Sequence, residues 1–210
     1  NTDFFIALFE SMMDRMLSQR EKSMLDRCLG TMYEPHVGKE TRPTLKDLYA
    51  TLRDERNPVA EELADSLEMY AQGSMDSFAG QTNVRTSAYF NLYVMSDLGK
   101  TMQTLGMMST LQHVRKCTYA NYRIGKPTYL LVEECQILFG NDAAVRMLDD
   151  YFSELRKFGL HIICVTQLPT RVLEHPLAVN LFENSGWFVL LPQQAKNVSL
   201  ISETFHLSKS

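Results

Sequence analysis

The sequence lacks the cysteine and histidine spacings that build most metal sites. Its four cysteines stand far apart, at Cys28, Cys117, Cys135 and Cys164, and its five histidines form no HxxxH or HExxH pair. Three of the cysteines fall within apolar helix or strand patterns, where free cysteine behaves as a small hydrophobic side chain. We therefore expect no zinc site and no disulfide framework, and a reduced, cytoplasmic setting.

Long apolar runs and strong net charge are also missing. The longest apolar runs, "FFIALF" and "IICV", are too short to cross a bilayer, and no basic segment precedes an apolar stretch as in a signal peptide. The 210 residues are 45% apolar and 22% charged with a net charge of −4, which is ordinary for a globular protein and does not indicate a nucleic-acid partner. Because residue 1 is asparagine rather than methionine, we expect a fragment of a longer protein.

The phosphate-binding loop GxxxxGK[ST] does not occur in the chain. "DLGKTM" at 97–102 contains Gly-Lys-Thr, but Val94 stands where the partner glycine is needed. "IGKPT" fails because Pro127 has no backbone N–H to offer a phosphate. Either the protein has no such loop, or the loop precedes Asn1.

The first 80 residues have the pattern of helices throughout. Asp3, Ser18 with Glu21, Thr44 with Asp47, and Asn57 before Pro58 predict four helix starts, and Gly73 predicts a helix end. Methionine and leucine recur at helical spacing, which is typical of a buried core. This part is expected to be a helical bundle without chemistry of its own.

The remaining residues alternate between strand and helix patterns. Strands are predicted at 87–95, 128–132, 160–166 and 186–192, with helices at 99–122, 143–159, 177–185 and 194–205. This alternation favours an α/β fold with a mostly parallel sheet buried on both faces. In such folds ligands bind at the carboxyl ends of the strands.

Two adjacent carboxylates follow the predicted strand "TYLLV". Hydrolysis of a nucleotide phosphate needs one carboxylate to hold the hydration shell of Mg²⁺ and another to orient or deprotonate the attacking water. Glu133 and Glu134 stand where such groups would be needed. The alternative is an ordinary strand that runs out into solvent.

Polar groups near the next strand allow the same two interpretations. Gln167, after Thr166, could bond both a water and a terminal phosphate, or could simply cap the following turn. Arg156 and Lys157 end the preceding helix, where cations are favoured by the helix dipole. Arg156 could instead reach the phosphate of a neighbouring subunit.

Taken in order, several segments resemble the VirB/TraE-type ATPases of conjugative transfer and type IV secretion, in the form found in integrative conjugative elements. They are "REKSMLDRCLGTMY", "PTLKDLY", "LADSLEMYAQGSMDSFAGQTNV", "VMSDLGKTMQTLGM", "YLLVEECQILF", "ELRKFGLHIICVTQLP" and "LFENSGWFVLLPQ". The resemblance implies an α/β, RecA-like P-loop NTPase motor domain that uses ATP and Mg²⁺. An all-helical insertion (1–80) would precede the C-terminal portion of the motor (81–210), and the P-loop would precede the insertion. The family's last strands would be absent here.

The resemblance also implies roles for individual residues. Glu134 matches the family's catalytic glutamate, Gln167 its sensor glutamine that contacts nucleotide, and Arg156 its candidate arginine finger. Glu133 stands where the family usually has aspartate, so its Mg²⁺ role, through water, is the less direct match. The implied assembly is a hexamer at the cytoplasmic face of the cell membrane, in contact with other inner-membrane secretion subunits.

Two other functions fit parts of the sequence. The departure at Glu133 also fits a catalytically decayed scaffold that only mediates assembly of the same machine. Direct DNA binding would need a basic face, and Arg115, Lys116 and Arg123 form only a modest cluster on one predicted helix.

Overall fold

The computed structural model describes residues 2–83 and 89–207. The chain divides into two compact units, Asn1–Gly106 and Met107–Ser210. The predicted helical part, 1–80, falls within the first unit, and the predicted subdomain boundary at residue 80 stays a prediction.

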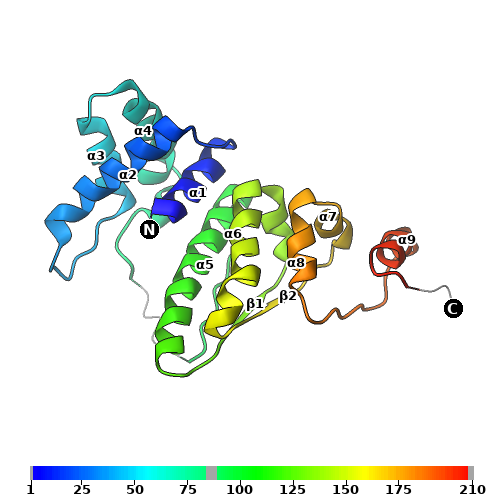
Figure 1. Cartoon of the computed structure of the whole chain (residues 1–210). Helices are drawn as coiled ribbons and strands as arrows, with labels where there is room; N and C mark the ends of the chain where they lie inside the picture. Colours follow the sequence, from blue (N-terminus) through cyan, green and yellow to red (C-terminus); the bar gives the residue numbers. More distant parts are fainter. Residues whose placement is uncertain (1, 84–88, 208–210) are drawn as a thin grey trace. The chain divides into compact units, whose positions relative to one another are not determined.

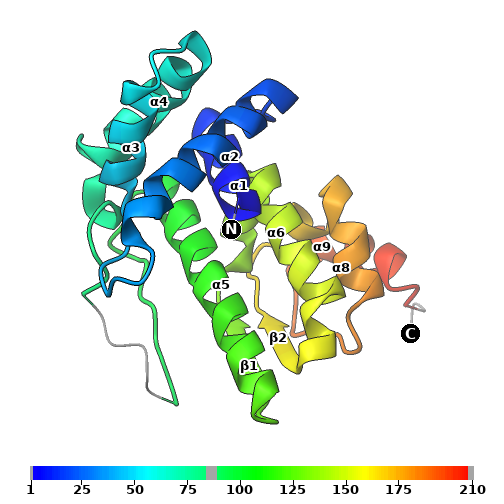
Figure 2. The same ribbon diagram turned by 60° about the vertical axis from the view of Figure 1, so that its left-hand side comes forward.

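The first unit contains the predicted helical bundle. Its helices are α1 (Thr2–Met13), α2 (Gln19–Tyr33), α3 (Leu45–Asp54) and α4 (Pro58–Ala71), with short 3₁₀ turns η1 (Glu34–His36) and η2 (Asp76–Phe78). Figures 1 and 2 show α2, α3 and α4 packed side by side, with α1 against α2 and α4. The apolar faces meet in a core whose fully buried members include Phe9, Leu25, Leu48, Leu52, Leu63 and Leu67.

Local capping signals place most of these helix starts correctly. Ser18 and Glu21 form the predicted capping box, and Thr44 and Asp47 form a second one. The Asn57 side chain accepts a hydrogen bond from the N–H of Val59, with proline at the first helical position. The prediction for Asp3 is wrong, because α1 begins at Thr2 and Asp3 already lies in its first turn.

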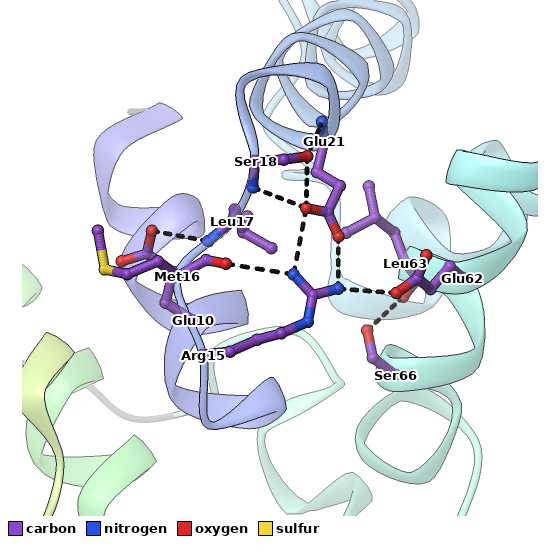
Figure 3. Close-up of polar contacts among 9 residues, drawn as sticks. All are labelled: Glu10, Arg15, Met16, Leu17, Ser18, Glu21, Glu62, Leu63 and Ser66. Carbon is purple, nitrogen blue, oxygen red and sulfur yellow. Dashed lines mark hydrogen bonds and ion pairs between the residues drawn. The ribbon is translucent and has the colours of Figure 1, made fainter.

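A group of ion pairs connects the turn after α1 with α2 and α4 (Figure 3). The Arg15 guanidinium donates to both carboxylate oxygens of Glu21, at 2.6 and 3.1 Å, and to Glu62 at 2.7 Å. The buried Glu10 carboxylate accepts the backbone N–H of Leu17 at 3.1 Å. The hydrogen bond from Arg15 lowers the pKa of the buried Glu21 carboxyl to about 2, against the opposing effect of burial.

The second unit holds the sheet and the helices around it. Helix α5 (Lys100–Arg123) begins in the first unit and continues into the second from Met107 onwards. Strand β1 (Thr128–Val132) follows it. The elements that follow are η3 (Cys135–Gly140), α6 (Asp142–Ser153), η4 (Leu155–Phe158), β2 (Leu160–Cys164), α7 (Pro169–Leu173), η5 (Pro176–Ala178), α8 (Val179–Glu183) and α9 (Ala195–Thr204). A helix is present within each predicted helical range, and the strand at 128–132 is confirmed. The predicted helix at 143–159 is divided into α6 and η4, the predicted strand at 160–166 ends at Cys164, and α7 was not predicted. No helix in the described ranges has the length and apolarity needed to cross a bilayer.

Strands β1 and β2 pair in parallel, in register from Thr128 opposite Leu160 to Val132 opposite Cys164. Val132 and Leu160 are buried, but Tyr129 and Leu131 are 71% and 63% exposed. The prediction of a sheet buried on both faces is therefore wrong for the described residues. Tyr129 stacks on His161 of β2, with ring centroids 4.8 Å apart, and this ring pair lies on the exposed face.

The predicted strands at 87–95 and 186–192 are not formed. Residues 87 and 88 lie outside the described residues, and 89–95 and 186–192 adopt no regular structure. A strand requires a neighbour to complete its hydrogen bonds, and within the described residues only β1 and β2 pair. The second segment is held instead by an aromatic cluster, in which Phe188 contacts Phe182 and Phe205.

Candidate active site

The parallel pairing brings the two strand exits together at one end of the sheet. The N–H of Val165 donates to the carbonyl of Val132 at 2.9 Å, and the N–H of Cys135 donates to the carbonyl of Val165 at 3.0 Å. Val165 is therefore hydrogen-bonded to the residue before Glu133 and to the residue after Glu134. These two glutamates form a short loop between the two bonds. We refer to residues 133–134 and 165–167 as the carboxyl edge.

Glu134 adopts a left-handed backbone conformation, with φ 54° and ψ 40°. For a residue other than glycine this conformation costs roughly 1–2 kcal/mol. The carbonyl of Glu134 accepts the N–H of Ile137 at 3.0 Å, so 3₁₀ turn η3 starts directly after it. The flanking bonds hold a strained turn in place, with both glutamate side chains exposed.

Thr166 and Gln167 follow β2 and have different roles. The Thr166 hydroxyl accepts the N–H of Leu168 at 3.1 Å, so the turn-capping alternative holds for this residue. The Gln167 side chain is exposed and makes no hydrogen bond with another described residue. Its amide is free to bond a ligand at the carboxyl edge.

Arg156 lies at the other end of the sheet. It belongs to η4, which is separated from β2 only by Gly159, while Gln167 follows β2. Five strand residues span roughly 16 Å, at about 3.3 Å each. Glu133, Glu134 and Gln167 are thus brought to one edge, and Arg156 is at the opposite end.

Comparison with known proteins relates the chain to a solved structure. No family model and no curated protein matches the sequence. Among solved structures, VirB4 of Thermoanaerobacter pseudethanolicus matches 99% of the chain with a TM-score of 0.75 and 20% sequence identity. The chain has a VirB4-like fold. The resemblance drawn from the sequence motifs is thereby confirmed at the level of the fold.

The match covers only part of the VirB4 structure. The chain spans 60% of the length of the VirB4 chain that it matches. Its two parallel strands correspond to only a small part of a RecA-like sheet, so that element of the predicted fold class is confirmed in part.

The carboxyl edge of this VirB4-like chain fits a water-mediated Mg²⁺ site. Mg²⁺ keeps several of its waters and is usually bound by one or two carboxylates together with substrate phosphates. Glu133 and Glu134 provide two exposed carboxylates, and the described residues form no cluster of three or more histidine, cysteine or acidic ligands. The donor set therefore suits an ion shared with a nucleotide rather than an ion caged by protein.

Two features of this edge were missed by the sequence analysis. The neighbouring Cys135 thiol, together with burial, raises the pKa of the Cys164 thiol above its ordinary value. Arg171 of α7 lies against Gly140 at the end of η3: a Cβ on this glycine would be 2.5 Å from Arg171 Nη2. Both contacts depend on the strand register, and no local sequence signal announces them.

The basic cluster on α5 is only partly a free surface. Arg115 Nη2 lies 3.6 Å from the Glu154 carboxylate, which offsets part of its charge, while Lys116 and Arg123 are exposed. The cluster does not form an extended basic face, and direct DNA binding gains no support from it.

Proposed function

We propose that the chain is the C-terminal part of the motor domain of an ATP-hydrolysing, VirB4-like subunit of a conjugative DNA-transfer or type IV secretion apparatus. The supporting observation is the geometry of Glu134. It is held in a left-handed conformation at the carboxyl edge, two backbone bonds fix its loop to Val165, and Gln167 follows Val165 by two residues. Strained residues of this kind cluster at functional sites.

The proposed reaction is the hydrolysis of ATP to ADP and phosphate. Glu134 accepts a proton from a water as its oxygen attacks the γ-phosphorus, and the bond from that phosphorus to the ADP oxygen breaks. Gln167 orients the water and the γ-phosphate through its amide. Glu133 holds waters of the Mg²⁺ shell, and Mg²⁺ when bound offsets the negative charge of the phosphates.

The phosphate cradle would come from residues other than these 210, because GxxxxGK[ST] is absent from the chain. The chain by itself is therefore expected to hydrolyse no ATP, whereas the complete protein does. Measurable turnover by the purified chain would show that the site is elsewhere.

The direct test compares two substitutions in the complete protein. Glu134→Gln should lower kcat for ATP hydrolysis by about 100-fold or more, because general-base catalysis alone contributes that much, and should leave ATP binding intact. Glu133→Gln should instead raise the Mg²⁺ concentration needed for half-maximal rate. Unchanged turnover in Glu134→Gln would overturn the assignment.

The position of Arg156 at the far end of the sheet supports a role in trans, across a subunit interface of a hexamer. Arg156→Ala and Glu134→Gln should each inactivate the assembly. Mixing the two variants should restore part of the activity, because an intact Glu134 in one subunit can then meet an intact Arg156 from the next. Absence of recovery, with mixed assembly demonstrated, would argue against this role.

The implied setting is the cytoplasmic face of the cell membrane, among other inner-membrane secretion subunits. A second candidate, a catalytically decayed scaffold of the same machine, is favoured by Glu133 at the position where aspartate is usual. An assembled complete protein with no ATPase activity would support the scaffold.

A further inference from the structure

The Arg171 guanidinium occupies the space in which a side chain at position 140 would lie. The guanidinium lies against Gly140, at distances of 2.5 Å from Nη2 and 3.7 Å from Cζ to the position that a Cβ would occupy. Gly140 ends η3, which starts directly after Glu134, and Arg171 lies on α7, which starts two residues after Gln167. One side chain thus connects the segments that follow the two strand exits.

The guanidinium itself has no protein partner in the described part of the chain. Arg171 is exposed, and its side chain makes no hydrogen bond or ion pair with another described residue. The absence of a side chain at Gly140 leaves room for the guanidinium beside η3. Its five N–H donors are therefore available to a ligand beside η3.

The residues around the two strand exits carry more negative than positive charge, so an anionic ligand there requires a cationic side chain. Residues 133–141 and 165–172, which make up the two strand exits, contain two glutamates and one cationic side chain, Arg171. A nucleoside triphosphate adds several negative charges, and arginine matches phosphate oxygens with two parallel N–H bonds.

We infer that Arg171 binds the terminal phosphate of the nucleotide within its own subunit, in addition to the trans role proposed for Arg156. This inference rests on the proposed ATPase function. The contact would also couple η3 to α7, so that the terminal phosphate orders the segments beside Glu134 and Gln167 together.

The test measures ATP and ADP affinity separately, in the complete protein with Mg²⁺. Arg171→Ala should weaken ATP binding by about 10-fold or more and leave ADP binding within about 2-fold, because only ATP carries the contacted phosphate. Arg171→Lys should lie between, since it keeps the charge but loses the paired donors. Arg123→Ala removes an exposed arginine from the last turn of α5 and serves as the charge control.

Gly140→Ala provides a test that leaves the arginine in place. The added methyl must displace the guanidinium, so ATP affinity should fall while ADP affinity is kept, and urea unfolding should show a folded protein. Gly186→Ala is the matched control, since no atom lies within 4 Å of the position of its Cβ.

The outcomes separate this inference from the proposed function. If Glu134→Gln abolishes hydrolysis but Arg171→Ala binds ATP as Arg123→Ala does, the inference is overturned and the ATPase assignment stands. Equal weakening of ATP and ADP binding would also overturn it, because it would indicate a structural role. If Glu134→Gln hydrolyses ATP normally, the proposed function itself fails.

Discussion

At the scale of single residues, the candidate site contains a residue, Glu134, whose backbone conformation is unfavourable for its residue type. Glu134 occupies a backbone region that favours glycine, yet it carries the side chain that the proposed chemistry needs. Two backbone bonds to Val165 keep it there. The strain and the proposed function thus reside in the same residue.

This conflict predicts opposite effects on stability and activity. Glu134→Gly should stabilise the chain by up to about 1 kcal/mol, because it relieves the left-handed strain, while the complete protein loses hydrolysis. Urea unfolding of the chain measures the first effect. Glu133→Gly is the control: this residue has no positive φ, so glycine there should destabilise by about 0.5–1 kcal/mol. If Glu134→Gly destabilises the chain, the claim that the backbone at Glu134 is strained is wrong.

The Arg15–Glu21 pair predicts a pH dependence in the first unit. The folded-state pKa of Glu21, about 2, lies below its ordinary value of 4.5. The stabilisation is therefore complete above about pH 4.5 and is lost as the pH falls towards 2. Glu21→Gln should cost about 1–3 kcal/mol at pH 7 and little at pH 2, as measured by urea unfolding.

Glu62→Gln is the matched control, because Glu62 pairs with the same arginine but its side chain is 60% exposed. It should cost less than about 1 kcal/mol. Equal effects of the two substitutions would show that burial of Glu21 does not matter.

At the scale of elements, a feature could be predicted from the sequence when the residues that form it lie close together along the chain. The two capping boxes join residues three positions apart, so the starts of α2 and α3 could be predicted from the sequence. The segments 89–95 and 186–192 have strand-like composition, but a strand also needs a partner. The contacts of Arg171 with Gly140 and of Cys135 with Cys164 depend on the register of β1 and β2, which local patterns do not contain.

The cap of α3 gives a prediction at this scale. Thr44 accepts the N–H of Asp47, so Thr44→Ala should destabilise the first unit by about 1 kcal/mol. Thr51→Ala, in the same helix, removes only a bond to the Asp47 carbonyl and should change stability by less than about 0.5 kcal/mol. Far-UV circular dichroism during urea unfolding distinguishes the two, and equal values would show that the cap is unimportant.

At the scale of the whole molecule, apolar surface remains exposed in the second unit. Tyr129, Leu131 and Ile163 lie on the open face of the two-stranded sheet, and Trp187 is 92% exposed. Contiguous exposed apolar surface in a soluble protein marks an interaction site or a tendency to associate. The chain spans 60% of the VirB4 chain that it matches.

We expect the isolated chain to self-associate through this face at micromolar concentrations. Leu131→Lys should reduce association in sedimentation velocity without lowering the free energy of unfolding, because the added charge lies in solvent. Val132→Lys is the contrast: Val132, the next residue along β1, is only 7% exposed, so a lysine there should unfold the second unit. A chain that stays monomeric at all concentrations would contradict the prediction.

The most direct test of the central claim is the identity of the nucleotide bound to the complete protein carrying Glu134→Gln. The protein is incubated with Mg²⁺ and radiolabelled ATP, isolated by rapid filtration, and its bound nucleotide is separated by chromatography. The structure predicts that the variant retains intact ATP for many wild-type turnover times, since binding groups remain and the base is gone. Bound ADP formed at the wild-type rate would contradict the assignment of Glu134.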